Sequence, residues 1–182
     1  RIFAEMRGSV NSGLALANPG SESASVSFYF TDASGVVARS GSLSIPANAQ
    51  LSKFLDEDPF FGPKGFSGSF TFSSSRPVSV VALRGRVNER GEFLLTTLPV
   101  ASISEASGSS VLIFPHFADG GGWQTQILLV NPSDTAITGA YQFVDPAGVP
   151  VGGSLTYSVA ARSATSILTS GAASEARVGS IR

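Results

Sequence analysis

The segment FPHFADGGGWQTQILLVNPSD (114–134) carries residue types that could perform acid–base chemistry. It holds the only histidine and the only tryptophan of the chain, His116 and Trp123. An imidazole acts as a general base when a nucleophile and an orienting carboxylate lie within hydrogen-bonding reach. Ser133 and Asp134 are the nearest candidates for these two roles. They follow an Asn-Pro pair, however, which is typical of a turn rather than of a catalytic group.

Carboxylates offer a second kind of chemistry. The acidic run Asp56, Glu57 and Asp58 is the best calcium candidate of the chain, because calcium binds carboxylate oxygens. Calcium needs several more converging oxygen ligands, so we favour a solvated acidic loop. His116 with Asp119 could form only part of a weak metal site, since one imidazole is a poor metal site.

The overall composition narrows the chemistry further. The chain has 182 residues, no cysteine and a net charge of −1. Zinc–thiolate sites, disulfides and thiol nucleophiles are therefore excluded. The twelve basic residues form no stripe, so nucleic acid is not an expected partner. The pairs Gly121-Gly122 and Gly152-Gly153 lack the strand–loop–helix setting of a nucleotide site. We expect no cofactor and no enzymatic activity.

The sequence shows neither a transmembrane segment nor a signal peptide. No apolar run approaches the roughly 18–20 residues of a transmembrane helix. No signal peptide precedes Arg1, so we take the chain as a mature or excised segment. Only 14% of residues are charged, against about 25% in an average soluble domain. Serine, threonine and glycine take the usual surface positions, which is typical of secreted β-rich modules.

Exposed aromatic rings could provide a binding surface. Phe60 and Phe61 lie in a long loop punctuated by proline and glycine, and with Trp123 they are candidates for a surface that binds a partner chain or a glycan. Phenylalanines in long loops more often fold back to close the end of a sandwich. Trp123, Tyr141 and Tyr157 could also stack on sugars, an expectation that rests on analogy between folds.

The elements that must position these residues are repeated along the chain. SGLALANPGSESASVSFYFTDASGV (12–36) aligns without a gap with TQILLVNPSDTAITGAYQFVDPAGV (125–149). Further blocks match in the same order, which chance does not produce. Such self-similarity is typical of repeated structural units. The further matches are 3–14 with 117–127, 45–55 with 159–168 and 66–70 with 177–181.

The repeat sets the expected domain boundaries. Residues 1–101 form unit one, residues 102–110 a polar linker, and residues 111–182 unit two. Unit two ends at the counterpart of about Thr71 and so lacks the equivalent of residues 72–101. Either a longer array continues, or the missing strands come from elsewhere.

Each unit reads as a series of β-strands. GSFTFS (68–73) alternates polar and aromatic residues, and PVSVVALRG (77–85) with EFLLTTLPV (92–100) flank a hairpin loop. The only helical candidate is FLDEDPFF (54–61), at most one turn. We predict an all-β protein with seven or eight strands of unit one in two antiparallel sheets. The expected architecture is two tandem immunoglobulin-like β-sandwich repeats, the second truncated.

The repeat also indicates whether residues 114–134 form a catalytic site or a structural loop. FADGGGW matches FAEMRGSV of unit one, which has no histidine, no tryptophan and no glycine triplet. We therefore expect Gly120–Gly122 to form a tight loop between strands, with Trp123 packed on the end of the sandwich.

The blocks GLALANP, FTDASG, SIPANAQLSKFLDE, PVSVVALRG, TTLPVA and FPHFADGGGWQTQILLVNP resemble tandem segments of large secreted or surface-anchored bacterial proteins, largely of unknown function. The resemblance covers nearly the whole chain and implies an extracellular location. It supplies no catalytic residues. In that family the VGSIR block is usually followed by another strand pair.

Three functions from different classes remain open. We expect a non-enzymatic structural, spacer or adhesion module whose partners are other protein chains, neighbouring repeats or cell-surface glycans. One alternative is a self-assembling subunit that donates residues 1–7 to the open edge of unit two. The N-terminal segment 1–11 shares Arg-Gly-x-Val-Asn with residues 80–88, a strand of the kind that unit two lacks. The other alternative is a carbohydrate-binding module.

Overall fold

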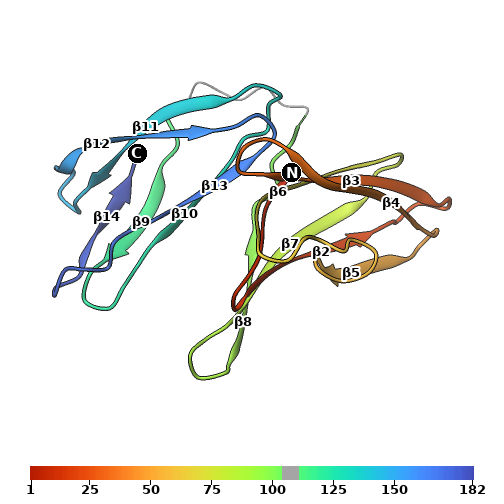
Figure 1. Cartoon of the computed structure of the whole chain (residues 1–182), viewed down its shortest axis with the longest axis horizontal. Helices are drawn as coiled ribbons and strands as arrows, with labels where there is room; N and C mark the ends of the chain where they lie inside the picture. Colours follow the sequence, from red (N-terminus) through yellow and green to blue (C-terminus); the bar gives the residue numbers. More distant parts are fainter. Residues whose placement is uncertain (104–110) are drawn as a thin grey trace.

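The computed structural model describes residues 1–103 and 111–182, and this part is all β, with 14 strands in antiparallel pairings and no helix (Figure 1). The helical turn considered for residues 54–61 is a run of hydrogen-bonded turns, in which the Phe61 N–H donates to the Glu57 carbonyl at 2.8 Å. Most of the expected linker, residues 104–110, lies outside the described residues. The strands are β1 (Ile2–Arg7), β2 (Val10–Ala17), β3 (Ala24–Asp32), β4 (Val37–Ile45), β5 (Gln50–Phe54), β6 (Phe66–Ser74), β7 (Ser79–Val87), β8 (Phe93–Leu98), β9 (Phe114–Asp119), β10 (Gln126–Val130), β11 (Ile137–Val144), β12 (Pro150–Val159), β13 (Ala164–Leu168) and β14 (Arg177–Ile181).

Strands β1–β8 form one hydrogen-bonded sheet in the order β4-β3-β6-β1-β2-β7-β8, with β5 also paired to β2. The sheet turns a corner at β2, where Met6 and Arg7 of β1 pair with the start of β2 and β5 takes the rest of that edge. The halves β4-β3-β6-β1 and β5-β2-β7-β8 therefore enclose one core. Residues 1–101 contain eight strands, which confirms the higher of the two strand numbers expected for unit one. The two separate sheets expected there are instead joined into one sheet at this corner.

Phenylalanines fill this core. Phe28, Phe30, Phe60 and Phe70 are buried, and the ring of Phe70 lies 4.9 to 5.5 Å from the other three. The alternation of β3 and β6 places Phe28, Phe30 and Phe70 on one face of their sheet, because successive side chains of a strand point to opposite sides. Phe60 reaches the same core from the loop between β5 and β6. Leu14, Leu16 and Ala82 close the core from the other half.

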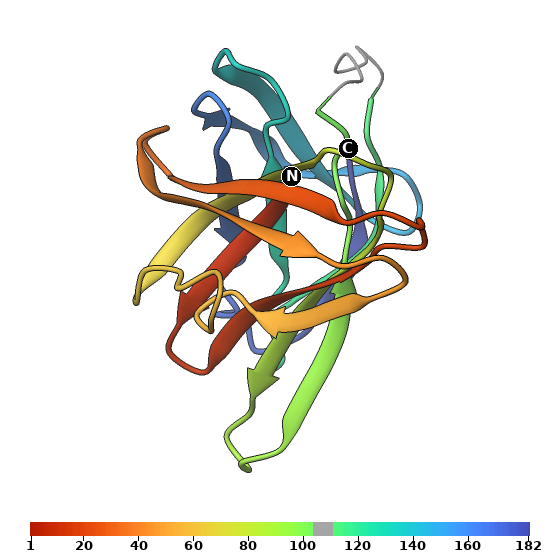
Figure 2. The ribbon, with the colours of Figure 1, turned by 90° about the vertical axis from the view of Figure 1, so that its right-hand side faces the viewer.

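Strands β9–β14 form a four-stranded sheet, β12-β11-β14-β9, and a two-stranded sheet, β10-β13. The first repeats the order of pairings in β4-β3-β6-β1, and the second repeats the pairing of β2 with β5. Strands β10 and β13 lie against β1 and β6 (Figure 1), so that β9–β14 stand behind β1–β8 when the molecule is viewed from the side of β1–β8 (Figure 2).

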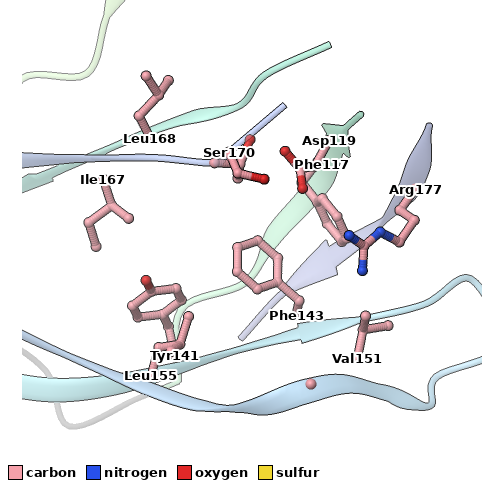
Figure 3. A pocket seen from close by; sticks show the side chains of 12 residues that line it. Phe117, Asp119, Tyr141, Phe143, Val151, Leu155, Ile167, Leu168, Ser170 and Arg177 are labelled. Atoms are coloured by element: carbon pink, nitrogen blue, oxygen red, sulfur yellow. The ribbon is translucent and has the colours of Figure 1, made fainter. Parts of the chain in front are cut away.

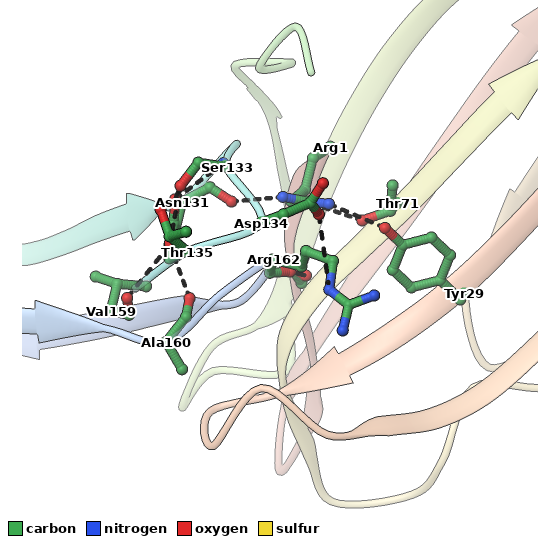
Figure 4. Close-up of polar contacts among 11 residues, drawn as sticks. Arg1, Tyr29, Thr71, Asn131, Ser133, Asp134, Thr135, Val159, Ala160 and Arg162 are labelled. Atoms are coloured by element: carbon green, nitrogen blue, oxygen red, sulfur yellow. Dashed lines mark hydrogen bonds and ion pairs between the residues drawn. The ribbon is translucent and has the colours of Figure 1, made fainter. Parts of the chain in front are cut away.

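Two buried asparagines hold matching turns in the two units. The side-chain amide of Asn18 donates to three main-chain carbonyls, and so does that of Asn131, at 2.7 to 3.3 Å. Their side-chain oxygens accept hydrogen bonds from the N–H groups of Gly20 and Ser133. A single side chain thus ties two loops together in each unit. The acceptors are Glu22, Ile45 and Pro46 for Asn18, and Thr135, Val159 and Ala160 for Asn131 (Figure 4).

Gly68 and Gly179 occupy matching positions in the two units, and their pairing partners show which residues of β1 and β9 correspond. A Cβ atom on Gly68 would overlap the carbonyl oxygen of Thr31, and one on Gly179 would overlap that of Val144. Gly68 pairs with Ala4, whereas Gly179 pairs with Phe117. Phe117 is therefore the counterpart of Ala4, and the expected match of residues 3–14 with 117–127 is one residue out of register at its start.

Candidate functional site

An apolar cavity of about 810 Å³ opens between the sheets of unit two. Its walls come from β10, β11, β13 and β14, and the exposed residues Val111 and Leu112 lie at its rim. A smaller cavity of about 290 Å³ shares Tyr141 and Ile167 with it. The two hollows together make the interior of unit two accessible from outside.

The equivalent place in unit one is filled. Tyr141 and Phe143 of β11 align without a gap with Phe28 and Phe30 of β3. The two phenylalanines of β3 are fully buried, whereas Tyr141 and Phe143 are only partly buried and line the smaller cavity. Strands β7 and β8, with Ala82 and Leu98 on the core of unit one, have no counterpart among the described residues of unit two.

The rim of the smaller cavity carries one carboxylate and one guanidinium (Figure 3). Asp119 and Arg177 face each other in the pairing of β9 with β14. The Asp119 carboxylate accepts a hydrogen bond from the Gly171 N–H at 2.7 Å. This bond, with another from Thr169, lowers the pKa of Asp119 below its ordinary value. The carboxylate therefore fixes a turn, and the cavity itself presents aromatic and aliphatic side chains.

The candidate catalytic residues of the first segment do not come together. His116 is exposed on β9 and lines neither cavity, whereas Asp119 lines the smaller one. Ser133 is held by the Asn131 side chain and the Thr135 carbonyl, each at 2.8 Å. Asp134 forms a long ion pair with Arg162 at 3.8 Å (Figure 4).

The glycine triplet forms the expected tight loop. Gly120, Gly121 and Gly122 all have positive φ angles, and Gly120 and Trp123 exchange two backbone hydrogen bonds of 3.0 Å. The expected packing of Trp123 is wrong, since its side chain is 65% exposed. The indole projects into solvent from the end of this loop.

The acidic run takes part in local bonds. Asp56 accepts a hydrogen bond from the Asn11 side chain at 2.7 Å, and Glu57 accepts one from the Phe54 N–H at 2.8 Å. Asp58 precedes a cis proline, Pro59. Within residues 1–103 and 111–182, the structure gathers no group of three His, Cys, Asp or Glu side chains that could hold a metal ion.

The candidate aromatic surface divides between core and solvent. Phe60 is fully buried and stacks edge-on against Phe28 and Phe70, so it is not part of a binding surface. Phe61 is 51% exposed and lies under the guanidinium of Arg39. The two adjacent phenylalanines differ in exposure because the turn directs the ring of Phe60 into the core and the ring of Phe61 toward solvent.

The three candidate sugar-stacking rings are also divided. Tyr141 and Tyr157 both line the larger cavity. Trp123 lies on the Gly120–Gly122 loop, next to the turn that contains Ala176. The two tyrosines therefore belong to the apolar hollow, and the indole belongs to a separate exposed loop.

Polar contacts join the two units at a junction that the sequence does not reveal. The guanidinium of Arg1 is buried and donates to the Asn131 carbonyl and the Thr71 hydroxyl at 2.6 Å, and to the Tyr29 hydroxyl at 3.0 Å (Figure 4). Burial of a guanidinium is tolerated because these hydrogen bonds replace its contacts with water. The sequence pattern does not predict this contact, because Arg1 and Asn131 are 130 positions apart.

Two serine hydroxyls complete the junction. Ser69 donates to the Arg162 carbonyl at 2.6 Å, and Ser163 donates to the Asp32 carbonyl. Both bonds run between β-strands or turns of different units, and both acceptors are main-chain atoms. The junction therefore depends on the path of the backbone more than on the identity of the accepting residues.

Strand β1 is buried on both faces. Ile2 and Ala4 point into the core of unit one, while Phe3, only 2% exposed, and Glu5 point toward β10 and β13. Arg84 binds Glu5 at 2.9 Å and Gln126 of β10 at 2.8 Å. Residues 1–7 are thus held within their own chain in this structure, between β2, β6, β10 and β13.

No helix among the described residues is long and apolar enough to cross a membrane. Comparison of the chain with protein-family models, with curated proteins and with solved structures found no match in any of the three.

Proposed function

We propose that this chain is a non-enzymatic structural module, a spacer or adhesion element of a secreted or surface-attached bacterial protein. It consists of two tandem immunoglobulin-like β-sandwich repeats, and the described residues of the second include no counterpart of β7 and β8. Its partners are neighbouring repeats of the same protein and other protein chains.

The observation that carries this proposal is the covered outer face of β1 and β6. Phe3, Ser69 and the Glu5–Arg84 pair all lie beneath β10 and β13. Repeat proteins gain stability from such contacts between neighbours, in addition to the stability of each repeat. A module that fixes the next module at a defined angle is suited to set distance and direction along a surface protein.

The chemistry of the junction also favours this role. Arg1, Ser69 and Ser163 all donate to main-chain carbonyls across the junction. Main-chain acceptors are provided by the fold of a repeat even when its side chains change. The same mode of packing is therefore available to successive repeats of different sequence.

Small-angle scattering of residues 1–182 tests the proposal. We expect one compact particle whose radius of gyration does not depend on protein concentration. Phe3→Asp should increase the radius of gyration with little change in far-UV circular dichroism, because an unpaired charge is not tolerated between packed sheets. Phe93→Asp, on the exposed strand β8, is the matched control. Scattering from the unaltered chain that fits two freely jointed particles would contradict a spacer.

A further inference from the structure

We infer that the open side of unit two is a receptor for a β-hairpin with the apolar pattern of β7–β8, which would pair with the free edge of β10. The inference rests on the proposed repeat architecture and adds the chemical nature of a partner. The bound hairpin would complete the second core in the way that β7 and β8 complete the first.

The first argument is the unoccupied edge of β10. In unit one, β2 pairs with β5 on one side and with β7 on the other. Strand β10 aligns with Gly13–Ala17 of β2 and pairs with β13, the counterpart of β5. Among the described residues no strand takes the place of β7 beside it. A strand edge with free N–H and C=O groups recruits another strand.

The second argument is the shape and character of the hollow beside this edge. The cavity of about 810 Å³ is lined by Ile127 and Leu129 of β10 and by Ile181 of β14. Val111 and Leu112 at its rim are more than 70% exposed, at 74% and 72%. Large apolar surface of this kind marks a site for another protein segment. One inserted strand pair would cover the wall and the rim together.

The third argument comes from unit one, which shows what such a pair looks like. Ser79–Leu83 of β7 pair with the residues of β2 that correspond to β10. Val80, Ala82 and Leu98 face the core, while Val81 and Leu95 face solvent. The partner is therefore an antiparallel hairpin in which every second residue of the inner strand is apolar and of small or medium size.

An extended chain provides the direct experiment. A second copy of residues 72–101 is joined directly after Arg182, the counterpart of Thr71, so that the added hairpin can reach β10. We expect amide hydrogen exchange in β10 to slow by about tenfold or more on pairing. Fluorescence of a dye that binds exposed apolar surface should fall at the same time. Strand β2, which is already paired on both sides, serves as the internal reference.

The control is the same extended chain with Val80→Asp and Ala82→Asp in the added copy alone. It should leave exchange in β10 unchanged, since two carboxylates cannot enter an apolar core. A free peptide of residues 75–100, added to the unextended chain, should protect β10 in a dose-dependent way. This second format guards against a linker that holds the added copy in the wrong place.

Two results would overturn the inference. One is unprotected β10 in both formats while β2 stays protected. The other is protection of β10 in the unextended chain that rises with its own concentration, which would make the occupant a second copy. Either result would leave the scattering test of the junction unaffected, so failure of the hairpin site and failure of the spacer role can be told apart.

Discussion

At the residue scale, two buried amides carry much of the turn structure. The side chain of Asn131 donates to three carbonyls, and its exposed fraction is 0%. Asn131→Ala should lower the free energy of unfolding by about 2–3 kcal/mol, because buried carbonyls lose their donors. Urea denaturation followed by circular dichroism measures this change.

Asn131→Asp distinguishes the donor role from simple filling of space. The aspartate keeps an acceptor for the Ser133 N–H but brings a negative charge against three carbonyl oxygens. It should therefore be at least as destabilising as the alanine variant. A well-tolerated aspartate would show that the amide is not the main support of this turn.

At the element scale, the loop between β5 and β6 buries Phe60 and leaves the adjacent Phe61 half exposed. Phe60→Ala should cost about 3–5 kcal/mol of stability, because it empties a fully buried site between Phe28 and Phe70. Phe61→Ala removes a half-exposed ring and should change stability by less than about 1 kcal/mol. Thermal and urea unfolding of both variants measures the contrast. Equal effects would mean that the loop adopts another arrangement.

The same elements show how far sequence patterns reach. Alternation in GSFTFS predicts that Phe70 and Phe72 share one face, and both do pack on the core. The hairpin loop between β7 and β8 is also confirmed, with Gly91 at a positive φ of 79°. These features depend on neighbours in the chain, which a pattern records directly.

Features that depend on distant pairing were predicted less well. Strand β1 reads as an ordinary strand, yet Phe3 is buried because β10 and β13 cover it. Burial of Phe60 and exposure of Trp123 likewise depend on the direction in which a loop leaves the sheet. The sequence indicates that unit two has no counterpart of residues 72–101, whereas the apolar cavity between its sheets is seen only in the structure.

At the scale of the whole molecule, β10 and β13 serve two purposes at once. One face covers Phe3 and Glu5 of unit one, while the other face contributes Ile127 and Leu129 to the cavity of unit two. Unit two therefore has one well-covered side and one open side. Stability should be unequal across the molecule, since regions with fewer buried apolar contacts open more readily.

Strands β3 and β11 are the matched pair that tests this inequality. Their aligned residues Phe28 and Tyr141 differ in burial because β7 and β8 cover only the first core. Amides of β11 should exchange faster than those of β3 by about tenfold or more, a difference of about 1.4 kcal/mol in opening free energy. Native-state hydrogen exchange in low urea measures both strands in one sample. Equal protection would mean that the junction through β1 makes the molecule unfold as a single unit, so that the covered side of unit two compensates for its open side.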